Sequence, residues 1–449
     1  MRLAKLTHLL TEALRAGAAP GAAIALSIDG ERMETAVGVA NSSSGVVLSS
    51  SSRFQLGCIT KLLTSLITLE LASVGRIDLD EPIGTYLPQI SDGVVGSSTT
   101  LRHLLSHTSG YQGVNVADPA IRYYYSWPKF LDALRSGTQL FPSGRVFNYE
   151  HTEYVMLGEI VRRVTGQPIQ ELFRTMIFDP LEIQCGSPRT DAESPHLCVM
   201  DHAFDVASGH YAPLRLVHYC HFWEASLSDL TMSLTDLVTL GEAVAGLTSR
   251  QIFNPSTVET MRRSYVDLPA CIGGPQHERI PVAFGCGCAQ YGDFVFGHNG
   301  SARGQTCALR FDLSSRVVLA VGLNCWRPHV RDMLCAKVFA AISDGGPGRR
   351  KSDGLRWSFT ELAGRYVGAL GTWVDVSAGQ TCLRLDIRGG SASQPLARVS
   401  LCPGREGELE VISDAPHLTV GFFSPSPSER PALMLGLNAF RKLTPGDHR

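Results

Sequence analysis

The hydrophobic residues of the chain fall into periodic stretches, and the first of these is helical. Leucines recur every three or four positions at the N-terminus, at Leu3, Leu6, Leu10 and Leu14. This spacing predicts an amphipathic helix. Two extended stretches follow at 22–28 and 32–39, and the Asp29-Gly30 dipeptide between them is typical of a hairpin turn. The N-terminal part therefore predicts a helix followed by two antiparallel strands.

Helical periodicity dominates the middle of the chain. The apolar stretch from Leu62 to Val74 predicts a helix that ends at Gly75. Further helices are expected at 154–164, 233–247 and 254–264. The segment from Cys185 to Ser226 has no clear period and contains several histidines and aromatic residues. A long irregular segment of this kind is typical of a binding loop or lid.

Extended patterns return after residue 280. We expect strands at 282–289, 294–297, 305–311 and 317–323, and a last helix at 331–342. Strands thus occur at both ends of this part of the chain, with helices between them. This order predicts an antiparallel sheet built from both ends, with the middle as a helical subdomain.

The C-terminal part has a different pattern. A stretch rich in glycine and basic residues, 343–351, indicates a linker. Seven short extended stretches follow, at 364–367, 373–376, 382–387, 397–401, 409–412, 419–422 and 432–435. Short strands separated by turns are typical of a small antiparallel barrel. We therefore expect two domains, residues 1–345 and 355–449, joined by a linker at 346–354.

Composition narrows the class of protein. The 449 residues are 44% hydrophobic and 18% charged, as in ordinary globular proteins. The net charge of -2 gives no reason to expect nucleic acid or a membrane surface as a partner, and no apolar run approaches the length of a membrane span. Polar residues interrupt the first helix, so we interpret it as part of the fold rather than as an export signal. We accordingly expect a cytoplasmic protein.

The twelve cysteines are scattered along the chain from Cys58 to Cys402. In a cytoplasmic protein they are expected as free thiols rather than disulfides. Cys286 and Cys288 are the closest pair, and no second pair has the spacing of a zinc site. We therefore expect neither a metal nor another cofactor.

The stretch from Gly57 to Lys61 carries the clearest chemical signal. Cys58 and Lys61 are three positions apart at the start of a predicted helix, so their side chains would share one face. The N–H groups of the helix N-terminus and the Lys61 ammonium would both favour a thiolate, the reactive form of cysteine. A neutral Lys61 could instead take the thiol proton. The alternative is that Cys58 is a small buried hydrophobic residue and Lys61 a surface charge.

Two further motifs occur downstream, Tyr149-Glu150-His151 and His298-Asn299-Gly300. With Cys58-Ile59-Thr60-Lys61 they resemble, in order and separation, the motifs of the serine β-lactamase and penicillin-binding-protein superfamily, closest to its class C and esterase-like branch. Those motifs are Ser-x-x-Lys, Tyr-x-Asn, and Lys-Thr-Gly or His-x-Gly. Supporting segments resemble the family as well: His107-Thr108-Ser109-Gly110, Met232-Ser233-Leu234-Thr235-Asp236-Leu237 and Phe284-Gly285-Cys286-Gly287.

The resemblance covers about residues 1–345 and implies an α-β-α sandwich with an antiparallel sheet and a helical subdomain. The C-terminal tail is similar to the lipocalin-like barrel that some members carry. We interpret the His107 to Gly110 segment as a turn with a structural role.

The chain departs from the family at two motif positions. The nucleophile position holds Cys58 instead of serine, and the second motif ends in His151 instead of asparagine. Lys61 and Tyr149, the general-base pair of the family, are retained. By resemblance, Cys58 would attack a carbonyl and form an acyl-enzyme, here a thioester, while Lys61 and Tyr149 would move protons.

The resemblance also implies supporting roles around the nucleophile. His298 would lie beside Tyr149 and would tune it or orient the substrate. The backbone N–H groups of Cys58 and Ser301 would form the oxyanion hole. Gly300 would let the substrate approach the strand edge closely.

Substrate binding is expected from His151, Asn299 and Gly300. His151 could equally be a second base, a hydrogen-bond donor to the substrate or a polar loop residue. We expect Glu150 to point to solvent.

A cysteine nucleophile favours some activities over others. A thiolate needs less help from a base than a hydroxyl does, and exchange between thioesters is close to thermoneutral. We therefore expect an acyltransferase or cyclase acting on an activated acyl group, carried as a small molecule or on CoA or a carrier protein, in a biosynthetic pathway. With water as acceptor, the same residues would make a hydrolase of a small ester, amide or thioester. In a third hypothesis the protein only binds, but the retained Lys61, Tyr149 and His298 argue against it.

Overall fold

The structure is a computed structural model of the chain. It describes residues 3–113, 126–187, 197, 199–205, 207–214, 224–268, 283–291, 294–302, 304–342, 357–368, 372–380, 382–389, 397–403, 409–413, 420–423, 431–435 and 438–443. The chain divides into two compact units. The first comprises Met1–Asp78, Tyr154–Ser264 and Gly285–Gly348, and the second comprises Leu79–Glu153, Tyr265–Phe284 and Arg349–Arg449.

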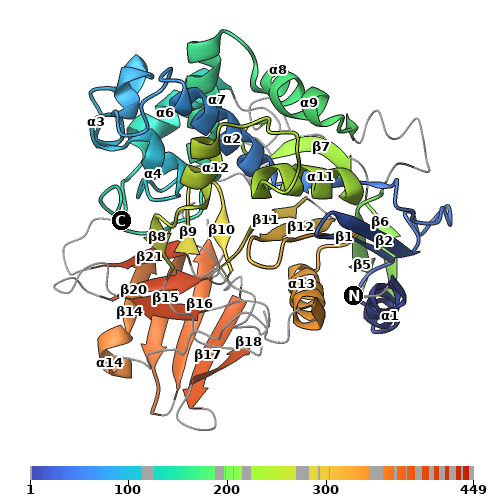
Figure 1. Cartoon of the computed structure of the whole chain (residues 1–449). Coiled ribbons are helices and arrows are strands. Elements are labelled where there is room, and N and C mark those ends of the chain that lie inside the picture. Colours follow the sequence, from blue (N-terminus) through green and yellow to red (C-terminus); the bar gives the residue numbers. More distant parts are fainter. Residues whose placement is uncertain are drawn as a thin grey trace. The chain divides into compact units, whose positions relative to one another are not determined.

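The first unit is built around an antiparallel sheet whose strands come from both ends of its sequence (Figure 1). The strand order is β2 (Glu31–Gly38), β1 (Gly21–Ile28), β13 (Val317–Leu323), β12 (Thr306–Asp312), β11 (Val295–Ser301) and β10 (Ala289–Gln290). The hairpin between β1 and β2 turns at Asp29 and Gly30, both with positive φ, as such turns require. The sheet built from both ends is as predicted.

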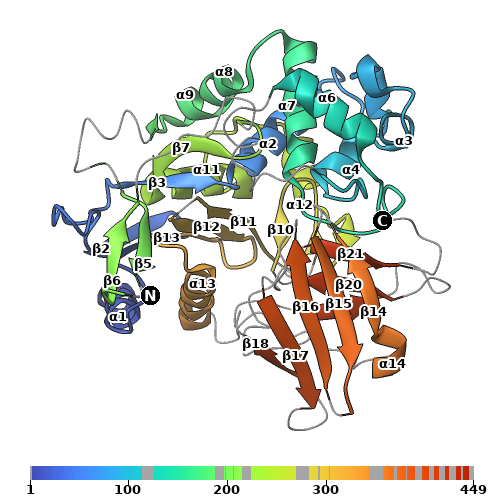
Figure 2. The ribbon, with the colours of Figure 1, turned by 180° about the vertical axis from the view of Figure 1, so that it is seen from behind.

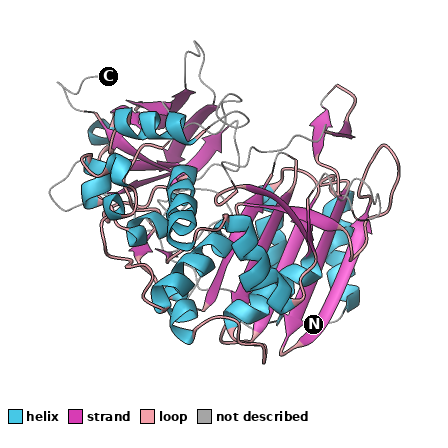
Figure 3. Cartoon of the chain, turned by 90° about the horizontal axis from the view of Figure 1, so that it is seen from above, coloured by secondary structure: helices cyan, strands magenta, loops and turns pink. Residues whose placement is uncertain are grey.

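Helices cover both faces of this sheet, as Figures 1 and 3 show. On one face, α1 (Leu3–Arg15) and α13 (Pro328–Ile342) share a hydrophobic core with β1, β12 and β13. On the other face, α11 (Leu234–Ala245) packs against the same strands. Figure 1 shows α2 (Thr60–Ser73) on the side of α11, and α2 contacts α12 (Pro255–Arg262). The predicted α-β-α sandwich is confirmed.

A smaller sheet delivers the chain to the first motif. Its order is β3 (Arg53–Gly57), β7 (Ser228–Ser233) and β4 (Cys185–Gly186). β3 was not predicted from the sequence, and it ends directly before Cys58. β5 (His202–Asp205) and β6 (His210–Pro213) form a hairpin inside the segment that we expected to be irregular. Other parts of that segment lie outside the described residues.

The longest of the remaining helices is α7 (His151–Thr165), which begins in the second motif and has most of its residues in the first unit. The other helical elements of the first unit are short: α8 (Ile169–Phe173), a π-helical turn at Arg174–Phe178 and α9 (Asp179–Leu181).

The second unit combines short helices with a large C-terminal sheet. The helical elements are short 3-10 turns at Ile83–Thr85 and Pro88–Ile90, α3 (Val94–Ser98), α4 (Leu101–Leu105), α6 (Trp127–Ser136) and α14 (Phe359–Leu362). β8 (Val266–Asp267) and β9 (Ala283–Phe284) form a small antiparallel pair. The predicted strand 282–289 is therefore wrong as one element, because a turn with positive φ at Gly287 separates β9 from β10.

The C-terminal sheet has eight antiparallel strands and its own hydrophobic core (Figure 2). The order is β18 (Leu409–Ser413), β17 (Ala397–Pro403), β16 (Leu383–Gly389), β15 (Thr372–Ala378), β14 (Gly364–Val367), β21 (Asn438–Lys442), β20 (Ala432–Leu435) and β19 (Val420–Phe423). The seven predicted strands are present and β21 is an additional one. In the described ranges this sheet forms a half-barrel, with β18 and β19 at its two ends.

A disulfide joins Cys382 and Cys402 across β16 and β17. The expectation that all cysteines are free thiols is therefore wrong for this pair. Adjacent antiparallel strands bring the two residues opposite each other, which sequence spacing alone did not indicate. The free cysteines among the described residues are Cys58, Cys185, Cys286, Cys288, Cys307, Cys325 and Cys335.

The predicted linker at 346–354 lies outside the described residues. The predicted domain boundaries stay a prediction. None of the helices in the described ranges is both long enough and apolar enough to cross a lipid bilayer.

Candidate active site

Cys58 lies in the turn between β3 and α2. Its side chain is partly exposed, whereas Lys61 in the first turn of α2 is fully buried. The Lys61 amide donates to the Cys58 carbonyl over 3.0 Å, so one helical turn links the two residues. This burial is the reverse of the alternative in which the thiol is buried and the amine lies on the surface.

The buried Lys61 amine is held by groups of the first unit. Its Nζ donates to the Ser226 carbonyl over 2.9 Å and lies 5.7 Å from the centre of the Tyr154 ring. The Tyr154 hydroxyl lies 3.1 Å from Ser65 Oγ, one turn further along α2. Removing a charged amine from water is costly unless the amine is paired or hydrogen-bonded. The hydrogen bond to Ser226 offsets part of this cost for Lys61.

The ends of β3 and β11 approach each other more closely than any side chain would allow. A Cβ atom at Gly57 would lie 2.5 Å from the Ser301 carbonyl oxygen and 3.0 Å from its nitrogen. A Cβ atom at Gly300 would lie 2.2 Å from the Leu56 carbonyl oxygen. The backbone of Cys58, which follows Gly57, is thereby brought beside Ser301. The two N–H groups predicted to form the oxyanion hole thus come from adjoining backbone segments.

His298 on β11 is buried and electrically neutral. Burial first, and then the positive charge of Lys61, lower the pKa of His298 to about 3. Its Nδ1 lies 2.7 Å from the Asn299 carbonyl oxygen, to which the neutral Nδ1–H form donates. In that form Nε2 is unprotonated and can accept a proton or a hydrogen bond.

Asn299 lies on the opposite face of β11 from His298, because side chains alternate along a strand. Its Oδ1 accepts a hydrogen bond of 2.6 Å from Arg310 on the neighbouring β12. The predicted substrate role of Asn299 stays a prediction.

Two buried arginines lie behind this strand and were not recognised from the sequence. Arg331 on α13 lies 3.5 Å from the Gly300 carbonyl oxygen, and both Arg310 and Arg331 contact Asp332. The available signal was a charged residue, Arg310, inside the apolar run of β12. These guanidinium groups fix the strand that presents Gly300 and Ser301.

Tyr149 and His151 belong to the second unit, and both are partly exposed. The Tyr149 ring lies against the His107 ring, with centroids 4.4 Å apart and planes at 40°, and the His151 ring meets Tyr149 edge-on at 5.8 Å. That Tyr149 acts beside Cys58 and Lys61 stays a prediction.

Glu150 is buried, so the expectation that it points to solvent is wrong. Its exposed fraction is 2%. Its amide nitrogen lies 3.2 Å from His107 Nδ1, and a Cβ atom at Gly113 would lie only 2.1 Å from its carboxylate. The segments that contain His107 and Gly113 enclose the Glu150 side chain. A prediction from the motif alone does not take these distant segments into account.

His107 and Glu153 form a buried pair that the sequence did not reveal. The Nδ1 of His107 lies 2.5 Å from Glu153 Oε2, and Glu153 Oε1 accepts from the Ser109 amide over 3.2 Å. The exposed fractions of the two side chains are 0% and 1%. The signal that could have found them is an acidic residue among the buried positions that begin α7.

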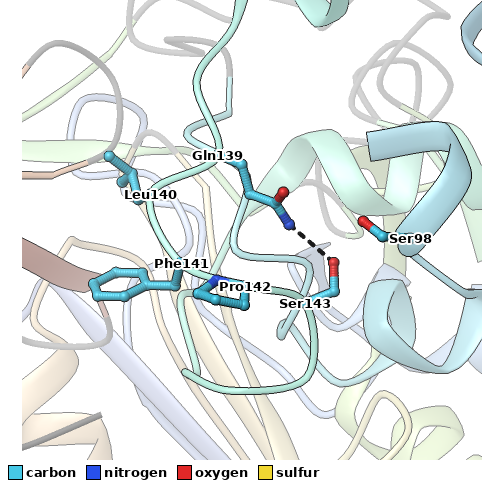
Figure 4. A pocket seen from close by; sticks show the side chains of 6 residues that line it. All are labelled: Ser98, Gln139, Leu140, Phe141, Pro142 and Ser143. Atoms are coloured by element: carbon cyan, nitrogen blue, oxygen red, sulfur yellow. Dashed lines mark hydrogen bonds between the residues drawn. The ribbon is translucent and has the colours of Figure 1, made fainter. Parts of the chain in front are cut away.

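A separate cavity of about 410 Å³ opens elsewhere on the second unit (Figure 4). It is lined by Ser98, Gln139, Leu140, Phe141, Pro142 and Ser143. The Gln139 amide donates to Ser143 Oγ over 3.0 Å across this cavity. None of the predicted site residues lines it. Among the described residues, no three His, Cys, Asp or Glu side chains gather as a metal site would require.

A model of the beta-lactamase family matches residues 6–340 of the chain. Penicillin-binding protein 4 of Amycolatopsis lactamdurans is 35% identical over 164 residues, which cover 36% of this chain and 43% of that protein. Esterase EstB of Burkholderia gladioli is 28% identical over 207 residues, which cover 42% of this chain and 53% of the esterase. Monacolin J acid methylbutanoyltransferase of Aspergillus terreus is 29% identical over 150 residues, which cover 29% of this chain and 36% of the transferase. The chain thus spans about half the length, or less, of these curated relatives.

Several solved structures match the chain almost from end to end. The crystal structure of SurE covers 98% of this chain and 99% of its own, with a TM-score of 0.74 and 21% identity. At this identity the likeness concerns the fold alone, and it includes the C-terminal sheet.

Proposed function

The chain belongs to the beta-lactamase family, and from this premise we propose that it is an acyltransferase or cyclase with Cys58 as its nucleophile. Its substrate is an activated acyl group, a thioester or an ester, carried as a small molecule or on CoA or a carrier protein. One observation carries the proposal. A partly exposed Cys58 thiol lies one helical turn from a fully buried Lys61 amine, beside the close backbone junction of Gly57 and Ser301.

The transfer takes place in two steps. In the first, the Cys58 sulfur bonds to the acyl carbon, the bond to the leaving thiol or alcohol breaks, and the thiol proton passes through Lys61 and Tyr149 to the leaving group. In the second, an amine or carbon nucleophile bonds to the acyl carbon, the carbon–sulfur bond breaks, and the proton of the nucleophile returns to Cys58. In a cyclase, that nucleophile belongs to the same acyl chain.

The backbone and His298 support these steps in the proposed mechanism. The N–H groups of Cys58 and Ser301 bind the oxyanion that forms on the carbonyl in both steps, an interaction often worth about 3 kcal/mol per donor. His298 stays neutral over the physiological range because burial and the Lys61 charge lower its pKa to about 3. In the proposed mechanism its unprotonated Nε2 accepts a hydrogen bond from Tyr149 or from the substrate.

The choice between transfer and hydrolysis rests on the acceptor. The methylbutanoyltransferase relative supports transfer of an acyl group, and a thioester reacts more readily with amines than an ester does. The esterase relative supports a second candidate function, hydrolysis of a small ester or thioester at the same site. We place transfer first because a cysteine nucleophile suits exchange of activated acyl groups, and we include a biosynthetic role and a cytoplasmic location in the proposal.

Product analysis tests the proposal. A panel of acyl thioesters is incubated with the protein, with and without an added amine, and the products are identified by mass spectrometry. We expect acyl-amine or cyclic products that disappear in Cys58→Ala. Cys185→Ser, which changes another partly buried free thiol, should retain full activity. Free acid as the sole product would establish the hydrolase, and unchanged turnover by Cys58→Ala would overturn the proposed nucleophile.

A further inference from the structure

His107 contacts three consecutive residues around the second motif. Its carbonyl oxygen accepts from the Asn148 amide over 2.8 Å, its ring lies against the Tyr149 ring, and its Nδ1 lies 3.2 Å from the Glu150 amide nitrogen. One residue from a distant part of the sequence therefore borders Tyr149 and both of its neighbours.

The imidazole is held in place from its other sides. Phe147 and Phe284 meet the His107 ring edge-on, at centroid distances of 5.8 and 5.3 Å. Glu153 lies 2.5 Å from Nδ1 and is itself anchored by the Ser109 amide. An imidazole fixed by two rings and one carboxylate has little freedom to rotate, so it can fix the ring that lies against it.

The pair is costly to bury, which argues against simple packing. Both side chains are almost completely removed from water. Hydrophobic residues of similar volume could pack there without desolvating an imidazole and a carboxylate. The backbone of His107 is also left-handed, at φ 55°, a conformation that few side chains adopt readily.

We propose that His107 and Glu153 are a positioning pair for Tyr149, which hold its phenol in the orientation needed for proton transfer. The inference rests on the proposed role of Tyr149 in acyl transfer. Glu153 orients the imidazole, the imidazole supports the phenol ring, and neither residue touches the reacting atoms. A misplacement of about 1 Å in a reacting group can cost about a hundredfold in rate, so such support has a measurable effect.

Two variants remove the pair with little change of shape. Glu153→Gln retains the size of the side chain and an oxygen that can accept from the Ser109 amide. His107→Asn removes the ring, while asparagine tolerates the left-handed backbone. The matched controls are Glu159→Gln, which removes the same charge further along α7, and His8→Asn on the exposed side of α1.

The test measures the rate of Cys58 acylation by an acyl thioester, together with a double-mutant cycle against Tyr149→Phe. We expect Glu153→Gln and His107→Asn to lower the maximal rate about 10- to 100-fold and to change KM less than about threefold. Adding either change to Tyr149→Phe should cause no further loss, because the pair acts through that residue. Both controls should react like the parent protein.

A second readout separates this inference from the proposed function. The ring signals of 13C-labelled tyrosine, with Tyr149 assigned through Tyr149→Phe, report its surroundings without any turnover. We expect the Tyr149 signal to shift or broaden in both variants and to stay unchanged in the controls. If the parent protein forms no acyl-enzyme but this signal responds, the proposed function fails and the contact stands. An unchanged signal and rate in both variants, or losses that add to that of Tyr149→Phe, would overturn the positioning pair.

Discussion

At the residue scale, the first unit contains a buried charged side chain, Lys61, beside the predicted nucleophile Cys58 in the sequence. Lys61 is fully buried and donates to the Ser226 carbonyl, and its positive charge contributes to the lowered pKa of His298. The partly exposed Cys58 thus precedes a helix whose first turn carries a buried amine. Burial of Lys61 was not predictable from the motif alone, because the same spacing suits a surface lysine. It follows from the apolar residues that surround it on α2.

Removal of the Lys61 amine should lower the rate of Cys58 acylation strongly and leave the protein folded. Lys61→Met retains much of the volume and removes the charge. We expect the rate of Cys58 acylation to fall by about 100- to 10,000-fold, as for loss of a positioned proton-transfer group. Stopped-flow measurement of the released thiol, beside circular dichroism of the folded protein, checks this. Lys337→Met, on an exposed part of α13, is the control and should react normally. A Lys61→Met protein with parent-like acylation would exclude a catalytic amine.

The lowered pKa of His298 makes stability depend on pH. The unfolded chain takes up a proton at His298 near the ordinary value of 6.5, whereas the folded chain does so only near 3. The unfolded state therefore binds more protons between these values, and the free energy of unfolding falls as pH decreases from 6.5. The loss approaches about 1.4 kcal/mol per pH unit for one such group.

Urea unfolding between pH 7 and 5 checks this prediction. His298→Asn removes the titrating group, so its stability should fall less steeply than that of the parent protein. The pKa values of His103 and His202 are also lowered by burial, and both residues remain in the two proteins as a common background. His210→Asn, at an exposed position, should show the slope of the parent. Equal slopes for His298→Asn and the parent would mean that His298 titrates normally.

At the scale of elements, the three motifs lie where strands and helices begin or end. The β3 terminus leads to Cys58, the end of β11 carries Gly300 and Ser301, and α7 begins at His151. The loop before α7 is tied to the C-terminal sheet, since the Ala439 amide on β21 donates to Asn148 Oδ1 over 3.0 Å. This sheet therefore contacts the residue directly before Tyr149.

Loss of the Asn148 side chain should loosen β21. Asn148→Ala leaves the Ala439 amide without this acceptor, and an unsatisfied buried group costs about 1–3 kcal/mol. We expect faster hydrogen exchange at 438–442, while Asn148→Asp, which retains the acceptor oxygen, exchanges more slowly than Asn148→Ala. Asn254→Ala removes the N-cap of α12 and is the control, with no effect on β21. Unaltered exchange at Ala439 in Asn148→Ala would show that the bond contributes nothing.

The sequence predicts elements best where periodicity is long. The helices at α1, α2 and α11 and the strands β1, β12 and β13 were identified because their apolar positions repeat over a full face. The break at Gly287 was missed, because nearby apolar residues imitate one continuous strand. The motif residues were found by their order, whereas the His107–Glu153 pair was not, because its partners are far apart in sequence and only the fold brings them together.

At the scale of the whole molecule, each of the two units carries part of the predicted machinery. The first holds Cys58, Lys61 and His298, and the second holds Tyr149 and the C-terminal sheet. Both are built from separated stretches of sequence. The second unit also contains the Cys382–Cys402 disulfide, which closes a loop of 20 residues.

Reduction of this disulfide should destabilise the second unit. Closure of a loop of this length restricts the unfolded chain and is worth about 3 kcal/mol. We expect the melting temperature to fall in the double variant Cys382→Ser/Cys402→Ser, or with reductant at pH 8. Reduction adds one hydrogen atom to each sulfur, so the mass of the parent should rise by about 2 Da. Cys335→Ser changes a buried free thiol and should not respond to reductant differently from the parent. A melting temperature indifferent to reductant would contradict this stabilising role.

The most direct measurement is the mass of the intact protein during reaction with an acyl thioester, followed by peptide mapping of the modified residue. Our account predicts a transient increase equal to one acyl group, located on Cys58 by fragmentation and released by hydroxylamine as a thioester is. Slower formation is expected in Lys61→Met, and none in Cys58→Ala. An adduct on another residue, or turnover with no adduct on Cys58 at any time, would contradict the account.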